Sequence, residues 1–219
     1  MTLLESAPPT LIFRPTQYPQ KTGSGYWTPS GKSVAVNFPL RTLFGIAYGV
    51  SPVYVVFPDD FNSGQTNYDV LITVPGDQKE ALQEELERQF GLTAHLETRD
   101  ADVLLLQIAD PAKLQLHKTK GGGYRNYEEG DRRIQKQIFK DVGLAMVADY
   151  VEVGKPVLDQ TGTKEHYDFE FQWTEPKWLT TAANNIAFQG IWAGRLKQVG
   201  LELFPTNLPS KMLVVEKAK

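Results

Sequence analysis

Two stretches of the chain, NYDVLITVP at residues 67–75 and HYDFEFQWTEP at residues 166–176, share one pattern. Each places Tyr-Asp ahead of a run in which apolar and polar residues largely alternate, and each ends at a proline. Alternation with period two places the apolar residues of a strand on one face of a sheet. The recurrence predicts two related β-strands that hold the same place in two related parts of the fold.

The sequence around these strands predicts an internal duplication. GKSVAVNFPLRTLFGIAYG, from Gly31, lies over GDRRIQKQIFKDVGLAMVA, from Gly130, without a gap, and Tyr68 and Tyr167 keep the same separation. Recurrence of pattern types in a fixed order marks duplication. We therefore predict two tandem pseudo-repeats of a β-α-β-β-α-β-β unit, which form an α+β fold with mixed or mainly antiparallel sheets.

Each copy begins with a strand and a helix. The strands are predicted at residues 34–38 and 134–138, and copy one continues with a helix over residues 39–48. Proline suits the first turn at residue 39 because the N–H that it lacks would have no partner there. In copy two the helix is predicted to follow its strand at once. Its apolar face is then made up of Phe139, Val142, Gly143 and Met146.

A second helix and a hairpin complete each copy. In copy one, Asp77 and Glu80 have the spacing of a capping box, and Gly91 stands where a helix often ends. The apolar segments that follow the second helices are predicted to form hairpins. These hairpins turn through RDAD at residues 99–102 and through PTNLPS at residues 205–210.

The copies define the predicted domain organisation. An N-terminal arm with one strand occupies residues 1–30, and the first repeat occupies residues 31–116. The second repeat occupies residues 130–219. Residues 117–129 are rich in glycine and charged residues, which is typical of an exposed linker.

Composition excludes several classes of function. The chain has 219 residues, a formal net charge of −3 and no cysteine, which excludes disulfides, thiolate nucleophiles and cysteine-ligated zinc. No basic excess points to a nucleic-acid partner. No apolar run reaches the roughly 18 residues that a transmembrane helix needs. The opening MTLLESAPPTLIFRPT lacks the charged and apolar regions of a leader peptide, so we expect none in this chain.

Few residues suggest catalysis or metal binding. The three histidines, His95, His117 and His166, lack the spacing of metal ligands, and we expect no metal and no cofactor. Asp59 and Asp60 are adjacent carboxylates that could perform acid–base chemistry, although a Pro-Asp turn before a strand is the favoured explanation. With His166, they are the best candidates for a small-molecule pocket between the two repeats.

A partner-binding site has two candidate regions. The segment KTKGGGYR lacks the Gly-Lys-Ser/Thr ending of a phosphate-binding loop, which leaves a linker or a contact loop. As a contact loop it would use Lys118, Lys120, Tyr124 and Arg125. Trp178 lies in a stretch without helical or strand periodicity, and an exposed tryptophan suits an interface.

Several separated motifs resemble one bacterial family. They are LRTLFGIAYGVSPVYVV, YDVLITVP, RQFGLTAHLETRD, GKPVLDQTGTKEHYDFEFQW and GLELFPTNLPSKMLVVEKA. Over residues 10–217, the chain is similar to the soil-bacteria-expanded conserved hypothetical protein family, an uncharacterised domain of unknown function. Lys155 and Lys164-Glu165 depart from its pattern. The resemblance implies a periplasmic or extracellular, envelope-associated protein. No catalytic residues are established for the family, so it implies none here.

Two hypotheses about function follow. The first is a non-enzymatic binding module of the bacterial cell envelope that contacts a protein or peptide partner, because no catalytic constellation is visible and duplicated α+β units leave sheet edges that can accept a strand. The alternative is a small-molecule-binding protein or an enzyme with its pocket between the repeats.

Overall fold

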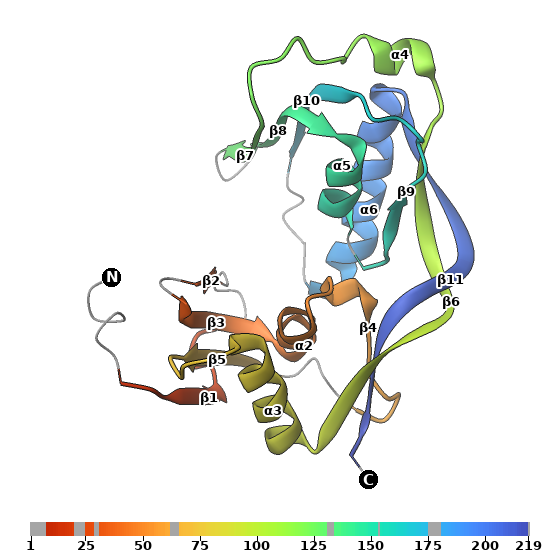
Figure 1. The fold of residues 1–219 in the computed structure, drawn as a ribbon. Coiled ribbons are helices and arrows are strands. Elements are labelled where there is room, and N and C mark those ends of the chain that lie inside the picture. The colour runs from red at the N-terminus through yellow and green to blue at the C-terminus, as the bar shows by residue number, and fades with distance from the viewer. Residues whose placement is uncertain are drawn as a thin grey trace. The chain divides into compact units, whose positions relative to one another are not determined.

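The computed structural model describes residues 8–19, 25–28, 31–61, 66–130, 134–152, 154–174 and 181–218, with only the backbone of residues 27, 130, 134–135, 173–174 and 181–189. These residues form helices and mostly antiparallel sheets, which confirms the predicted α+β class (Figure 1). The chain divides into two compact units. Unit 1 comprises residues 1–99 and 210–219, and unit 2 comprises residues 100–209.

Unit 1 is built on a four-stranded antiparallel sheet with the order β1-β5-β3-β2. Its strands are β1 (Leu11–Pro15), β2 (Gly25–Trp27), β3 (Ser33–Pro39) and β5 (Asn67–Ile72), and its helices are α2 (Leu40–Tyr48) and α3 (Gln78–Phe90). Both helices pack on one face of this sheet (Figure 1). Asp77 caps α3 by accepting hydrogen bonds from the N–H groups of Lys79 and Glu80, as the capping-box spacing predicts.

The core of unit 1 follows from helix and strand periodicity. One stripe of α2 is buried and packs on alternate residues of β3 and β5, with α3 completing the cluster. The buried side chains from these elements are Leu40, Leu43, Phe44, Ala47, Ala35, Val70, Ile72, Leu82 and Leu86. Burying a large apolar side chain contributes roughly 1.5–3 kcal/mol, so this cluster holds the helices to one face and leaves the other free of them.

Unit 2 repeats the arrangement with a three-stranded antiparallel sheet of order β10-β8-β7. Its elements are α4 (Pro111–Gln115), β7 (Arg125–Gly130), β8 (Ile134–Gly143), α5 (Leu144–Val151), β10 (His166–Thr174) and α6 (Thr181–Gln198). Phe139, Phe169 and Phe171 pack with Trp192 and Leu196 in its core. The apolar residues of the second quoted strand thus lie on the core side, as predicted.

A third sheet contains two long strands, in the order β4-β11-β6-β9. Its strands are β4 (Val55–Val56), which follows the short helix η2 (Pro52–Tyr54), β6 (Leu92–Ile108), β9 (Val157–Asp159) and β11 (Leu201–Lys217). In unit 1, β4 pairs in parallel with β11 at Leu213, and in unit 2, β9 pairs in parallel with β6 at Leu104.

The predicted hairpins are wrong, because β6 and β11 each continue as one strand of 17 residues. The tight turns that favour hairpins need residues of positive φ, and no described residue of either segment has one. Pro205 and Pro209 are tolerated because their nitrogens face away from β6. The Ala109 N–H donates to the Gly200 carbonyl, so the backbone groups of Gly200 face β6. Backbone groups of successive residues point to opposite edges of a strand, so those of the odd-numbered prolines face away from β6.

The first helix of copy two is also displaced from its prediction. β8 extends to Gly143 and α5 begins at Leu144, five residues later than the ungapped alignment with Leu40 places it. Of the predicted helical face, Phe139, Val142 and Gly143 are therefore strand residues, and Met146 lies in the helix. Both units still present the order strand, helix, strand, strand, helix, strand, from β3 to β6 and from β8 to β11. The internal duplication and the domain boundaries stay predictions.

Candidate functional site

A polar bulge interrupts the central strand of the unit 1 sheet. Val36 and Asn37 of β3 both lie opposite Asp69 of β5, because the register shifts between Ala35 and Phe38. Asn37 has φ 61°, a left-handed conformation that asparagine tolerates better than most residues. Its N–H donates to Asp69 Oδ1 at 3.0 Å, and its side-chain Oδ1 accepts from Asn67 Nδ2 at 3.0 Å.

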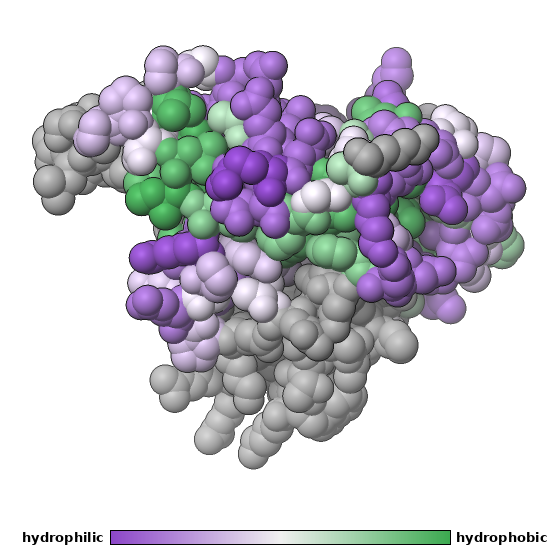
Figure 2. Space-filling view, turned by 90° about the horizontal axis from the view of Figure 1, so that it is seen from below, coloured by the Kyte–Doolittle hydropathy of each residue, from purple (hydrophilic) through white to green (hydrophobic). Residues whose placement is uncertain are grey.

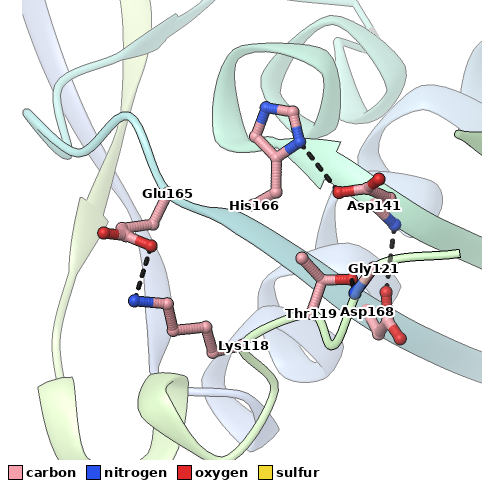
Figure 3. Close-up of polar contacts among 7 residues, drawn as sticks. All are labelled: Lys118, Thr119, Gly121, Asp141, Glu165, His166 and Asp168. Atoms are coloured by element: carbon pink, nitrogen blue, oxygen red, sulfur yellow. Dashed lines mark hydrogen bonds and ion pairs between the residues drawn. The ribbon is translucent and has the colours of Figure 1, made fainter. Parts of the chain in front are cut away.

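The same bulge occurs in unit 2 with ionisable side chains. Lys140 and Asp141 of β8 lie opposite Asp168 of β10, and Asp141 has φ 53°. The Asp141 N–H donates to Asp168 Oδ1 at 3.0 Å, and His166 Nδ1 lies 3.0 Å from Asp141 Oδ1 (Figure 3). The set Asn37, Asn67 and Asp69 in unit 1 therefore corresponds to Asp141, His166 and Asp168 in unit 2.

These contacts explain why an aspartate recurs at the same place near the start of each strand. In both units the aspartate accepts the hydrogen bond of a left-handed residue that would otherwise leave its N–H unpaired inside the sheet. Burial alone would raise the pKa of Asp168, but hydrogen bonds from the Asp141 N–H and the Thr119 hydroxyl and the charge of Lys140 outweigh it and lower that pKa. The motif is thus a structural device of the bulge.

His166, predicted as a pocket residue, lies in an exposed polar cluster of unit 2. Its side chain is 53% exposed and faces Asp141, while Lys118 pairs with Glu165 at 2.6 Å beside it (Figure 3). A histidine paired with a carboxylate has the composition of a general base. However, Asn67 and Asn37 hold the same geometry in unit 1 with neutral amides, so the fold accounts for the pairing. Across the described ranges, no three or more His, Asp or Glu residues are grouped to hold a metal ion.

The predicted contact loop lies beside β10 and leads into β7. Lys118 forms a single antiparallel bridge with Tyr167, and Lys120 is exposed. Tyr124 is 58% exposed, and Arg125 begins β7 at the edge of the unit 2 sheet. The segment predicted as a linker therefore supplies an edge of the sheet and brings Lys118 near His166.

The predicted carboxylate pair lies in unit 1, next to β4. Asp59 and Asp60 line a shallow concavity of about 530 Å³, which Arg99 and Lys217 also line. Lys217 forms a hydrogen-bonded ion pair with Asp60, and this hydrogen bond lowers the pKa of Asp60. Asp60 thus has a cation as its partner, and Arg99 lies in the same concavity. Trp178, the other predicted contact residue, lies outside the described residues.

The sequence interpretation missed an apolar surface on unit 1, on the side of the sheet away from α2 and α3. The outer face, as we call it, consists of Ile12 on β1, Val34 and Val36 on β3, and Leu71 on β5. Its concavity of about 320 Å³ is bordered by Arg14 and Tyr18. Figure 2 shows hydrophobic residues gathered on the side of the molecule where β1, β5 and β3 lie.

A sequence signal for the outer face was present. Val70, Leu71 and Ile72 are three consecutive apolar residues, so the strand carries apolar side chains on both of its faces. In the second strand Glu170 occupies the place of Leu71, which is why that strand alternates more cleanly.

The corresponding face of unit 2 is charged. Lys140 and Glu170 stand in the places of Val36 and Leu71, Lys136 lies on the same face, and Ile138 is buried among them. Lys136 pairs with Glu170 at 2.9 Å, and Lys140 pairs with Asp168 at 3.4 Å. Neighbouring side chains satisfy these charges, whereas the outer face of unit 1 leaves apolar groups exposed to solvent.

Comparison with known proteins places the chain in a family. The family described as Protein of unknown function (DUF3738) matches residues 41–218, and the chain belongs to it. This confirms the expected membership in an uncharacterised domain family. No curated protein and no solved structure matches the chain significantly. In the described ranges, no helix combines the length and the apolar composition needed to cross a membrane.

Proposed function

We propose that the protein is a non-enzymatic binding module that holds a protein or peptide partner on the outer face of unit 1. The observation that carries this proposal is the concavity of about 320 Å³ whose floor is formed by apolar side chains from three strands. Ile12 is 45% exposed and Tyr18 53% exposed at its border. Val34, Val36 and Leu71 are half-buried between them. An apolar concavity with exposed apolar side chains at its border is typical of interaction sites.

The contrast between the units supports the assignment. Both sheets carry the same bulge, so the scaffold does not require an apolar outer surface. In unit 2, Lys140 occupies the place of Val36, and Glu170 occupies the place of Leu71. A face that could be charged but remains apolar suits a function that requires it to be covered.

The envelope location is part of the same proposal and is supported by the family resemblance. Cell fractionation with an antibody against the chain tests it. The proposal expects the protein in the periplasmic or extracellular fraction, separate from a cytoplasmic marker. Recovery together with the cytoplasmic marker would remove this part of the proposal and leave the binding face untouched.

A pair of reciprocal variants tests the binding function. Val36→Lys gives unit 1 the residue that unit 2 carries at the same bulge position, and Asp69 lies opposite it as Asp168 lies opposite Lys140. Lys140→Val is the matched control in unit 2. Partners captured by cross-linking from the native cell's envelope fraction are identified, purified and titrated against each variant.

The proposal expects Val36→Lys to weaken binding of the identified partner at least about tenfold, which corresponds to about 1.4 kcal/mol. Lys140→Val is expected to keep the wild-type affinity. Circular dichroism and urea unfolding check that both variants are folded. Equal affinity of all three proteins, or a loss only in Lys140→Val, would contradict the proposed face.

The small-molecule alternative has one specific observation in its favour. The concavity of about 530 Å³ beside Asp59 and Asp60 has room for a ligand and offers charges of both signs. Thermal-shift screening of polar metabolites tests it, because a ligand at about 100 times its dissociation constant adds roughly 2.7 kcal/mol of stability. A hit that is lost in Asp59→Asn would favour this alternative over the binding module.

A further inference from the structure

We propose that the partner binds by strand addition, with an extended peptide segment pairing along the free edge of β1. The segment places an apolar residue beside Ile12 and a carboxylate on Arg14. This inference rests on the proposed function, since it states how a partner occupies the outer face and what chemistry the partner needs.

Among the described strands, none pairs with the outer edge of β1, which we call its free edge. β1 is the last strand of its sheet, and its other edge pairs with β5. The Thr73 N–H donates to the Thr10 carbonyl and the Thr16 N–H to the Asn67 carbonyl, both at 2.8 Å. In an antiparallel pair hydrogen-bonded residues alternate, so the even-numbered residues of β1 bond to β5. The N–H and C=O groups of Leu11 and Phe13 therefore point outward.

The free edge has a defined length. Pro15 ends β1, and its nitrogen can donate no hydrogen bond to an added strand. An added segment would thus bond mainly to Leu11 and Phe13, which matches a short peptide. Edge strands are the usual acceptors of such segments, because their unpaired backbone groups supply affinity without a special side chain.

In the described part of unit 2, no named strand stands in the place of β1. The segment in that place forms one bridge with β10, between Lys118 and Tyr167, with backbone hydrogen bonds at His117 and Thr119. It then passes through Gly121, Gly122 and Gly123, all of which have positive φ and cannot continue a strand. The free edge and the apolar outer face therefore occur together, in the same sheet.

Side chains on the outer face select the chemistry of the added segment. Ile12 and Arg14 are alternate residues of β1 and share this face. Ile12 is 45% exposed and would be covered by an apolar neighbour on the added strand. The Arg14 side chain is 58% exposed and lies 3.5 Å from Asp69, whose other oxygen accepts from the Asn37 N–H. Its remaining donors suit a carboxylate of the partner.

The test uses the whole chain and two synthetic peptides. The first is acetyl-Thr-Val-Thr-Glu-Thr-Val-Thr-amide, in which both valines share the face of the glutamate, and the second has lysine in place of glutamate. Amide hydrogen exchange is measured by nuclear magnetic resonance, and affinity is measured by titration to about 1 mM, the level of weak specific binding. The glutamate peptide is expected to slow exchange at Leu11 and Phe13. Ile12, already bonded to β5, should change little.

Charge reversal sharpens the test. Arg14→Glu is expected to weaken binding of the glutamate peptide about tenfold, which corresponds to the loss of about 1.4 kcal/mol from one charge-assisted contact. The lysine peptide should then become the preferred ligand. Arg125→Glu, on the edge strand β7 of unit 2, is the matched control and should leave both affinities unchanged.

Three results would overturn strand addition. The first is no change at Leu11 and Phe13 with either peptide. The second is binding that ignores the charge at Arg14. The third is protection of the same amides by a concentration-dependent dimer without peptide, which would make a second copy the occupant. If Val36→Lys still abolishes capture of the natural partner, the binding function stands and only the strand-addition mode fails.

Discussion

The sheet of unit 1 and the sheet of unit 2 share the hydrogen bonds of their bulges and differ in the surface they present. In both, an aspartate from the Tyr-Asp pair holds the N–H of a left-handed residue at 3.0 Å. One surface is apolar around Val36, and the other is charged around Lys140. The shared hydrogen bonds serve folding, because a bulge leaves backbone N–H and C=O groups that need partners. The differing part is where function can be sought.

The largest expected effect contrasts two glycines that follow corresponding helices. At Gly200, after α6, an added Cβ would lie 2.3 Å from the Asp110 carbonyl oxygen, whereas at Gly91, after α3, it would meet nothing within 4 Å. Both have positive φ, which costs any other residue about 1–2 kcal/mol. Gly200→Ala should cost about 3 kcal/mol or more, because the strain adds to a backbone clash. Gly91→Ala should cost about 1 kcal/mol. Urea unfolding measures both, and equal losses would contradict the contrast.

The next effect concerns the aspartates of the bulges. Asp69→Ala leaves the N–H of the buried Asn37 without its acceptor, at an expected cost of about 2 kcal/mol. Asp69→Asn keeps an acceptor and should cost about 1 kcal/mol. Asp168→Ala should be milder than Asp69→Ala, since the Asp168 side chain is 29% exposed and that of Asp69 is 12% exposed. Chemical denaturation ranks the stabilities of the three variants. A larger loss of stability for Asp168→Ala than for Asp69→Ala would show that the two aspartates do not play the same part.

A smaller effect isolates the left-handed backbone. Asn37→Gly removes the side-chain contacts but relieves the strain of positive φ, while Asn37→Ala removes the contacts and keeps the strain. Alanine should therefore be less stable than glycine by about 1 kcal/mol. The same order is expected for the two substitutions at Asp141. Thermal unfolding of the four variants measures it, and an alanine as stable as the glycine at either site would argue against the bulge geometry.

Much of this fold was predictable from local patterns. The α+β class, the cap at Asp77 and the core side of the Tyr-Asp strands followed from periodicity and capping, which depend on neighbouring residues. The length of β6 and the start of α5 were not, since they depend on pairing with distant segments. Both units carry the same bulge three residues before the helix, at Asn37 and at Asp141, and the ungapped alignment does not bring these two residues together.

Little of the candidate site was predictable. His166 was identified for its chemistry, yet its position follows from the bulge that Asn67 also serves in unit 1. The outer face was missed because the apolar residue Leu71 was assigned to the alternation of the strand. Only the register across β1, β5 and β3 shows that Ile12 and Val34 lie beside it.

The smallest expected effect is the pH dependence that Asp168 contributes to stability. The pKa of Asp168 is lowered in the folded protein, so the stability this carboxylate contributes is present above its ordinary pKa, near 4, and is lost as the pH falls below it. Asp168→Asn removes that contribution. The difference in unfolding free energy between wild type and variant should narrow as the pH is lowered from about 6 to 3. A constant difference across this range would contradict the lowered pKa of Asp168.

The central claim is that the outer face of unit 1, and not the corresponding face of unit 2, receives the partner. Nuclear magnetic resonance titration of the labelled whole chain with the identified partner tests it most directly. The account predicts shifts at Ile12, Val34 and Leu71, with Ile138 and Glu170 unchanged. Shifts at Ile138 and Glu170, with Ile12, Val34 and Leu71 unchanged, would contradict it.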